Sequence, residues 1–526
     1  MEITGSGNTM SVWMATADMP QRKPLEEDLH TDVCVVGAGI SGLTTAYLLA
    51  RAGKSVVVLE DGPIGGGETS RTTAHIVNAF DDRYYEIERL HGAEGARLTA
   101  QSHTAAIDEI ERIAREENIA CDFERLDGYL FVPPGDPNDE LDRELEACHR
   151  AGLVDVRRAD RAPLESFETG VCLRFPNQAQ FHPLRYLAGV AEAVERQGGR
   201  IFTGSHVSAI EGGKDGEPAR VKVGEDGPTV TADDVVVATN TPVNDIVTMH
   251  TKQFPYRTFV IALRVPRGSV TRALYWDTPH PYHYVRLQSA AGHDLLIVGG
   301  EDHKTGQEDD AAIRFARLEG WARERFPAAE QVEATWSGQV MEPMDYLAFI
   351  GRNPGDEHVW IATGDSGNGI THGTIAGMLL RDLILGRANP WATLYDPNRR
   401  TLGSALHFAK ENLNMVAQYT GWVTGGEVSD ESEIPRDSGA VIRRGLRKVA
   451  VYRDEQGALH ECSAVCTHLG AIVGWNSKEK TWDCPAHGSR FDRFGCVLNG
   501  PAISNLGPAE KEESREDEEA ARQDRS

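Results

Sequence analysis

The chain has 526 residues with 54 Lys and Arg against 80 Asp and Glu, which gives a formal charge of −26 and a pI of about 5.1. Its length predicts about three structural units, at roughly 100–200 residues per domain. The acidic balance argues against a nucleic-acid partner, because phosphate binding needs a basic patch. The apolar runs fall far short of the ~18–20 residues that cross a bilayer, and no export signal is visible, so we expect no membrane span and a cytoplasmic location.

The predicted elements alternate between strand and helix from Thr31 onward. Residues 1–30 are expected to be an extended N-terminal lead-in. The strand VCVVGAG, the helix SGLTTAYLLARAG and the strand VVVLE then form a βαβ unit, and the Gly-rich loop GPIGGGETSRTTAH follows. Further helices are predicted over 84–120 and 181–200, and a buried strand over 233–239.

The pattern changes in the second half of the chain. Between about 255 and 300 the long strands TFVIALRV, YHYVRLQ and DLLIVGG are typical of an antiparallel sheet. The strand HVWIATGD precedes a helix that is predicted to begin near Gly373. Residues 396–430 are predicted to be a helical and loop linker, and 508–526 an acidic, disordered tail.

The first βαβ unit carries a dinucleotide-binding pattern. Gly37, Gly39 and Gly42 form GAGISG directly after the first strand, and Glu60 ends the second strand, 18 residues beyond Gly42. The glycines allow the tight turn, the approach of the backbone to a pyrophosphate and close helix–strand packing. Glu60 suits a ribose with a free 2′-hydroxyl, so this pattern by itself leaves FAD and NAD open.

Two further segments decide between these cofactors through a resemblance. GGETSRTTAH and HVWIATGDSGNGITHG are similar to FAD-binding loops of the D-amino-acid-oxidase-like flavoproteins, the family of sarcosine and glycine oxidases. The resemblance covers about residues 31–400 and implies FAD. It also implies an α/β FAD-binding domain of the Rossmann (glutathione-reductase-like) type at 31–395, with an antiparallel-sheet substrate subdomain at about 80–180 and 250–340. The FAD contacts that it implies are Gly37, Gly39, Gly42, Glu60, Ser70, Arg71, Thr72, Val207, Gly364, Gly367 and Gly369.

A Cys/His cluster lies near the C-terminus. CTHLG and CPAHGS each offer one thiolate and one imidazole. The pattern resembles the Rieske [2Fe–2S] domain, which implies a small all-β module at 431–507 with one such cluster. Zinc is the alternative, although zinc fingers usually pair their ligands as Cys with Cys and His with His. The ligands that the resemblance implies are Cys466 and Cys484 on one iron and His468 and His487 on the other.

The cluster module departs from many Rieske domains in two respects. Extra cysteines that form a disulfide in many members are replaced by Ala471 and Ala486, and a tyrosine of high-potential members is Phe491 here. Hydrogen bonds to the cluster stabilise its reduced state, so the loss of a hydroxyl lowers the potential. We expect a middle to low Rieske potential.

The whole architecture resembles the bacterial FAD-dependent oxidoreductases with a fused C-terminal Rieske domain, over about residues 11–507. This implies an enzyme that oxidises a CH–NH bond of a small amine and passes electrons from flavin to cluster and on to a partner. The alternative is an electron-transfer protein that takes electrons from a carrier and supplies a separate oxygenase. A Rieske oxygenase within one chain is a third hypothesis, but no convincing pair of iron-binding histidines is found, since His280 and His283 read as strand residues.

The substrate-site candidates are aromatic and basic residues of the predicted antiparallel sheet, together with the loop residue Arg71. Period-two spacing places Tyr282, Tyr284 and Arg286 on one strand face, where they could clamp a carboxylate or simply pack in the core. Sarcosine oxidases have a flavin-linking cysteine in a region where this chain has none, so we expect non-covalent FAD. They also have a lysine that promotes oxygen reduction near the position of Ile297, and its absence favours a dehydrogenase. The candidates for catalysis are Arg71, Tyr256, Arg257, Tyr284 and Arg286.

Overall fold

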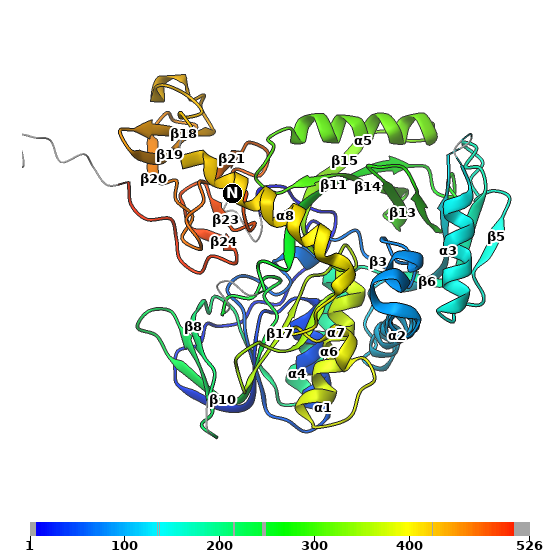
Figure 1. Ribbon diagram of the computed structural model, residues 1–526, viewed down its shortest axis with the longest axis horizontal. Coiled ribbons are helices and arrows are strands. Elements are labelled where there is room, and N and C mark those ends of the chain that lie inside the picture. The colour runs from blue at the N-terminus through cyan, green and yellow to red at the C-terminus, as the bar shows by residue number, and fades with distance from the viewer. Residues whose placement is uncertain are drawn as a thin grey trace, which may run out of the picture.

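Two large sheets and a smaller β module make up the fold of the computed structural model, which describes residues 7–509 apart from 134, 136, 214, 215, 245–248 and 423. In Figure 1 the first sheet lies at the bottom, the second at the upper right and the C-terminal module at the upper left. The tail that was expected to be disordered lies outside the described residues from 510 onward.

The first sheet has the predicted Rossmann-type core. Its apolar central strands are parallel and buried. One face packs against helices, and the other against the antiparallel strands β8 (Val207–Glu211) and β9 (Ala219–Val223). The strand order is β16 (Phe349–Arg352), β17 (Val359–Thr363), β10 (Thr229–Val237), β1 (Leu29–Val36), β2 (Val56–Leu59) and β7 (Arg200–Phe202), with β16 antiparallel and β8 and β9 attached beside β10.

The helices of this domain pack closely against one another. Helix α1 (Ile40–Arg51) contacts both α4 (Pro183–Arg196) and α6 (Gly369–Ile384). Helix α6 begins at Gly369, four residues before the predicted start near Gly373. Gly373 lies inside the helix because a Cβ there would come within 2.6 Å of the Ile40 side chain, so this glycine serves helix packing and not helix initiation.

The second sheet is antiparallel along most of its width, as predicted, with β12 (Leu274–Asp277) and β4 (Glu124–Phe131) pairing in parallel. Helix α5 (Ala311–Arg325) covers β11 (Gln253–Val265) and β14 (Asp294–Lys304). Helix α2 (Tyr84–Glu116) is kinked at Gly92, where φ is +72°. Helix α3 (Asp139–Arg150) packs against α2. The strand order is β15 (Val332–Pro343), β11, β14, β13 (His283–Ser289), β12, β4, β6 (Cys172–Gln180) and β3 (His75–Ile76), with β5 (Arg157–Ala159) beside β6.

The C-terminal module is all-β, as expected. Helix α8 (Ala405–Ala417), which follows the short α7 (Ala392–Tyr395), leads into it across the molecule (Figure 1). The core of the module includes Trp482, Phe491 and Tyr452, all of them buried. One sheet contains β18 (Ser438–Arg444), β19 (Arg447–Arg453) and β20 (Leu459–Ser463), and the other β21 (Gly474–Asn476), β22 (Thr481–Asp483), β23 (Arg490–Asp492) and β24 (Val497–Asn499).

The N-terminal segment is more than a lead-in. Trp13 is fully buried and its indole N–H donates to the Thr72 carbonyl at 2.6 Å, while the Ser11 hydroxyl donates to the Ser70 carbonyl. The Asn8 N–H donates to the Glu479 carbonyl of the C-terminal module at 3.0 Å. This segment therefore joins the unit built from the two large sheets to the C-terminal module.

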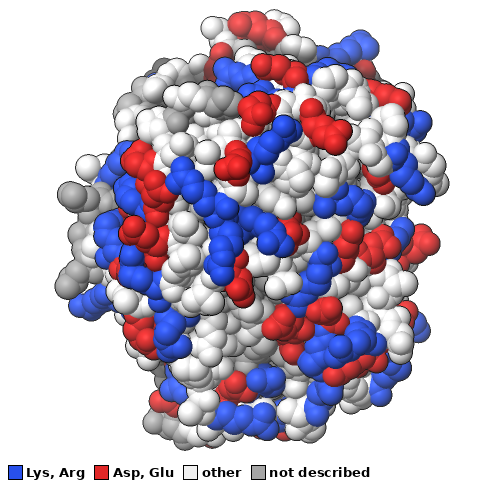
Figure 2. Space-filling view, turned by 90° about the vertical axis from the view of Figure 1, so that its right-hand side faces the viewer, with Lys and Arg blue, Asp and Glu red and all other residues white. Residues whose placement is uncertain are grey.

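Charged side chains of both signs cover the face of the molecule that Figure 2 shows. There, basic and acidic side chains are interspersed and form no field of one sign. In the part of the chain that the structure describes, no helix is both long and apolar enough to span a membrane.

Candidate functional site

A cavity of about 970 Å³ runs from the carboxyl ends of the first sheet's parallel strands to the second sheet. Gly37 and Glu60 line one end, and Tyr256 and Tyr284 line the other. Ligands of open α/β sheets bind beside the carboxyl ends of the strands, so the position suits an elongated cofactor with a substrate at its far end.

The Glu60 end has the geometry of a dinucleotide site. Gly37 has φ of +104°, and a Cβ at Gly42 would lie 1.9 Å from the Gly37 carbonyl oxygen, so both positions require glycine. Gly39 is the N-cap residue of helix α1 and has no side chain, so the helix N-terminus, where the Ile40 N–H donates to the Thr69 hydroxyl at 3.2 Å, is open to phosphate oxygens. The Glu60 carboxylate accepts from the N–H groups of Ala38 at 2.6 Å and Gly62 at 3.0 Å, although burial raises its pKa. These residues fit the adenosine and pyrophosphate parts of FAD, the cofactor that the resemblance implied.

The predicted FAD contacts converge on the cavity with two exceptions. Gly42 and Ser70 are not among its lining residues, since Gly42 packs against the preceding turn and the Ser70 hydroxyl donates to the Gly67 carbonyl. The lining positions are Gly37, Gly39, Glu60, Arg71, Thr72, Val207, Gly364, Gly367 and Gly369.

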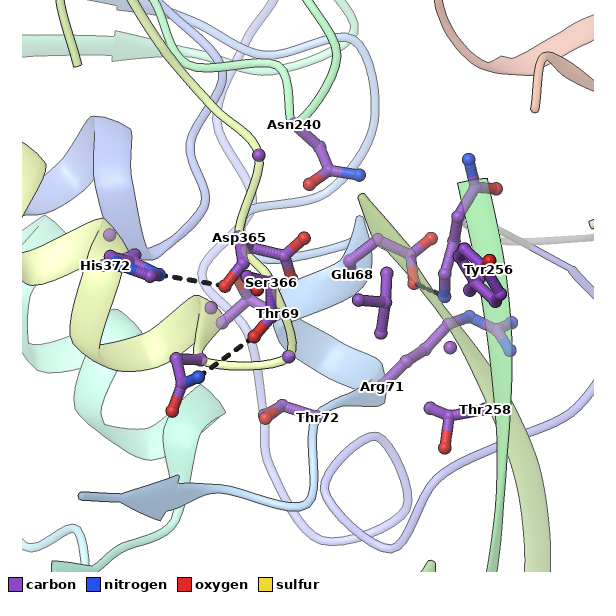
Figure 3. A pocket seen from close by; sticks show the side chains of 18 of the residues that line it. Glu68, Thr69, Arg71, Thr72, Asn240, Tyr256, Thr258, Asp365, Ser366 and His372 are labelled. Atoms are coloured by element: carbon purple, nitrogen blue, oxygen red, sulfur yellow. Dashed lines mark hydrogen bonds between the residues drawn. The ribbon is translucent and has the colours of Figure 1, made fainter. Parts of the chain in front are cut away.

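Arg71 lines the cavity with its stem but directs its charge elsewhere. In Figure 3 its side chain points away from Asp365 and His372. The guanidinium donates to the carbonyl oxygens of Gly7 and Ser337 and lies 3.5 Å from the Glu479 carboxylate. The Arg71 guanidinium therefore lies at the junction between the two-sheet unit and the C-terminal module, and not in the open part of the cavity.

The second sheet does not form a carboxylate clamp, which the sequence left open as an alternative to packing in the core. Arg286 is buried beneath the sheet, where its guanidinium donates to the carbonyls of Ala74 and Phe181 and stacks on Trp13. Arg257 is also buried, and it donates to the Ser337 hydroxyl at 2.6 Å. Neither arginine lines the cavity. On β11, alternation puts Arg257 on the face opposite Tyr256. Arg286 shares the face of Tyr284, but its guanidinium is held by the carbonyls of Ala74 and Phe181.

The far end of the cavity is acidic and aromatic. The rings of Tyr282 and Tyr284 lie 5.5 Å apart, Tyr284 bonds to the Thr258 hydroxyl at 2.6 Å, and Tyr282 reaches Asp81 at 3.5 Å. Ten acidic side chains but no lysine occur among the described residues that line the whole cavity, with Glu60 and Asp61 at the opposite end included, and the arginines of the lining are all engaged by carboxylates or carbonyls. Such a lining attracts cations and repels carboxylates.

Burial shifts the protonation of these acids. Desolvation raises the pKa of Asp81 to about 6 and that of Asp302 to about 6. Burial, together with the neighbouring Asp81, raises the pKa of Asp82 to about 8, and that of Glu342 is raised as well. The Ser366 hydroxyl lies 3.1 Å from Asp82 and 2.9 Å from Glu342, so these two carboxyls form one group. A bound cation would favour their ionised forms.

The two Cys/His loops of the C-terminal module come together at one end of that module. The rings of His468 and His487 are 4.9 Å apart, and the hydrogen bond between the two thiols lowers the pKa of Cys466 to about 7 and raises that of Cys484. The four side chains form a thiol pair and an imidazole pair, and in the described part of the chain no three His, Cys, Asp or Glu side chains lie together as ligands of one ion. Two irons with two ligands each suit this arrangement.

The imidazole pair faces the unit built from the two large sheets. The ring of His250, which is buried, lies 4.8 Å from that of His468 and 6.3 Å from that of His487. Gln339, which lines the large cavity, donates from Nε2 to the Gly488 carbonyl of the second loop at 3.1 Å. The cluster loops and the large cavity are thus separated by one side chain at this point.

Glu479 is the centre of the junction between the units. It lies 3.5 Å from Arg71 and 4.0 Å from Arg257, and it accepts from the Thr9 N–H at 2.9 Å and from the Ser337 hydroxyl. Burial alone would raise its pKa, but the charges of Arg71, Arg257 and Arg490 outweigh burial and hold the pKa at about 2. We call these four charged side chains the junction cluster.

The sequence did not predict the junction cluster or the acidic side chains at the far end of the cavity. Glu479 stands in NSKEKT, which reads as a solvated turn, and nothing local connects it with residues 71 and 257. The adjacent acids Asp81 and Asp82 in FDDRYY, just after the flavin loop, were the available signal for the acidic group.

Comparisons with known proteins agree with this division of the chain. The family model "FAD dependent oxidoreductase" matches residues 32–383, and the model "Rieske [2Fe-2S] domain" matches residues 425–510. The chain is 32% identical over 499 residues to YhfW of Bacillus subtilis (strain 168), whose name assigns it a Rieske 2Fe-2S centre, with 94% of this chain and 96% of that protein covered.

Two more relatives concern the first unit. Gamma-glutamylputrescine oxidoreductase of Escherichia coli (strain K12) is 29% identical over 381 residues, which cover 69% of this chain and 86% of that enzyme. The crystal structure of glycine oxidase from Geobacillus kaustophilus superposes with a TM-score of 0.57 at 18% identity, covering 71% of this chain and 99% of that one, and shows the shared fold. The first unit binds FAD and the second a [2Fe–2S] cluster, which excludes the zinc alternative. The chain therefore belongs to the FAD-dependent oxidoreductase family and carries a C-terminal Rieske domain.

Proposed function

We propose that this protein oxidises a cationic amine at FAD and passes the electrons through its Rieske cluster to an external acceptor protein. The observation that carries the proposal is the acidic and aromatic far end of the cavity, where Asp81, Asp82 and Glu342 lie beside Tyr282 and Tyr284. A relative that acts on a putrescine derivative, as its name states, supports an amine substrate.

The side chains of the cavity have separable roles in this reaction. Asp81 attracts the ammonium group, and the tyrosine rings exclude water and stabilise the cation through their faces. The raised pKa of Asp82 suits a carboxyl that accepts a proton from the ammonium, because the amine must be neutral to be oxidised. FAD, when bound, supplies the acceptor for the hydride of the C–H bond next to nitrogen.

Anaerobic flavin reduction tests the function. We expect diamines and their monoacylated derivatives to bleach the flavin of the purified protein, and glycine, sarcosine and NADH to leave it oxidised. Bleaching by NADH with no response to any amine would favour the alternative, an electron-transfer protein that supplies an oxygenase.

Asp81→Asn should weaken the binding of the amine about 10- to 100-fold, because a charge-assisted contact contributes about 1.5–3 kcal/mol. Affinity in the wild type should rise as the pH increases through about 6, since Asp81 and Asp302 ionise there and only the ionised carboxylates attract the cation. The measurement is the amine-induced change of the flavin spectrum from pH 5 to 8. Asp226→Asn, an exposed carboxyl outside the cavity, is the control. An Asp81→Asn protein with unchanged affinity would contradict the assignment.

We propose that Cys466, His468, Cys484 and His487 hold the cluster. Cys484→Ser should therefore remove the Rieske EPR signal of the reduced protein and most of its about two irons, because the thiolate of one iron is lost. Cys496→Ser changes an exposed cysteine outside both loops and should leave iron and spectrum unchanged. An intact signal in Cys484→Ser would show that the cluster is held elsewhere.

The FAD should be bound without a covalent link. His75 lines the cavity and is the nearest candidate for such a link, and burial lowers its pKa to about 3. Acid precipitation should leave a yellow supernatant and a colourless pellet. Flavin that remains on the wild-type polypeptide but not on His75→Ala would establish a histidyl link instead.

A further inference from the structure

Part of the cavity wall next to Glu60 belongs to the Rieske domain. It consists of β24 and the turn after it, and β24 lies above β8 of the first sheet in Figure 1. The residues of this segment that line the cavity are Val497, Leu498, Asn499, Gly500, Ala502 and Ile503.

This wall rests on the rim of the cavity itself. The Asn499 amide donates to the Glu68 carboxylate at 2.8 Å, and the Ile503 carbonyl lies 3.2 Å from His206 Nε2. Both partners, Glu68 and His206, also line the cavity. The other ring nitrogen of His206 lies 3.2 Å from Asp61, whose hydrogen bond raises the pKa of the imidazole and so favours the form that donates from both nitrogens.

The wall is mechanically connected to the junction cluster. Asn499 on β24 pairs with Arg490 on β23, and the Arg490 charge contributes to the low pKa of Glu479. The same segment meets His206, whose neighbours Ser205 and Val207 line the Glu60 end of the cavity. A movement that separates the domains at Glu479 therefore also withdraws the wall from this end.

We propose that residues 497–503 of the Rieske domain are part of the FAD-binding site, and that FAD leaves the protein only after this domain undocks. Because coupling between two equilibria is reciprocal, bound FAD must then hold the Rieske domain in place as strongly as the domain holds FAD. In this proposal the Rieske domain controls the release of FAD in addition to carrying electrons.

Hydrogen exchange of the full-length protein tests this reciprocity. After FAD is removed, the amides of residues 497–503 should exchange at least about tenfold faster, while those of the β18–β19 hairpin, which does not line the cavity, should keep their rates. Equal exchange of 497–503 with and without FAD would overturn the proposal.

FAD release, followed by flavin fluorescence after dilution, provides the second test. Asn499→Ala removes the hydrogen bond to Glu68 and should speed release about fivefold. Gly306→Val acts from outside the cavity, because a side chain there meets Pro485 of the Rieske domain within 2.9 Å, and it should also speed release. The control is Leu446→Ala, at a residue that is 86% exposed on the hairpin. Wild-type release in Asn499→Ala, or faster exchange of 497–503 in Gly306→Val without faster FAD release, would overturn the proposal.

Discussion

Glu479→Ala should destabilise the docked arrangement of the two domains by about 3–5 kcal/mol, the usual effect of removing one partner from a buried ion pair. Arg71 and Arg257 are fully buried and would lose the carboxylate that compensates their charges. The Thr9 N–H would lose its acceptor in the same step, so the N-terminal segment would be released as well. We expect calorimetry to show an earlier first transition and a protease to cut the linker around α8 faster.

The pH dependence of this contribution follows from the direction of the shift. The pKa of Glu479 is held at about 2, below its value in an unfolded chain, so the stabilisation is present above about pH 4.5 and is lost as the pH falls toward 2. Glu479→Gln retains an acceptor for Thr9 and should be less damaging than Glu479→Ala. Glu455→Ala, at an exposed residue of the same domain, is the control. A Glu479→Ala protein that melts and resists protease like the wild type would show that the junction is held by other contacts.

The parts of the site that could be predicted are those encoded by neighbouring residues. The turn from Gly37 to Gly42 and the two cluster loops are local patterns whose backbone geometry is fixed within a few residues. The long alternating strands between residues 255 and 300 were equally readable, because burial on one sheet face leaves a period of two.

The parts that could not be predicted depend on contacts between distant segments. Arg286 resembled a substrate-binding residue because it shares a strand with Tyr284, but the carbonyls of Ala74 and Phe181 capture its guanidinium beneath the sheet. Likewise, Thr9, Arg71 and Glu479 meet although 470 residues separate the first from the last. The residues around Glu479 would be the same whether its side chain were exposed in a turn or buried in an ion pair, so only the tertiary fold distinguishes the two cases.

The reduced flavin should react slowly with oxygen and quickly with the cluster. The strand β14 carries no lysine at Ile297, and its last residue, Lys304, pairs with Glu411 of helix α8 instead of lining the cavity. No positive charge from this strand is therefore available to stabilise developing superoxide. Gln339 meanwhile lies between the cavity and the second cluster loop, so we expect a short path for electrons from the flavin to the cluster.

Stopped-flow reoxidation of amine-reduced protein measures how much of the reduced flavin reacts with oxygen and how much with the cluster. Transfer to an artificial one-electron acceptor should outrun the reaction with air in the wild type, and Cys466→Ser, which lacks the cluster, should slow that transfer at least about tenfold, equivalent to about 1.4 kcal/mol of activation free energy. Cys496→Ser keeps both loops and should behave like the wild type. Reduction of the flavin by the amine should be unchanged in all three proteins, because the acidic end of the cavity is intact in each. Rapid peroxide formation in air that does not respond to loss of the cluster would instead identify an oxidase, in which the Rieske domain is not the main exit for electrons.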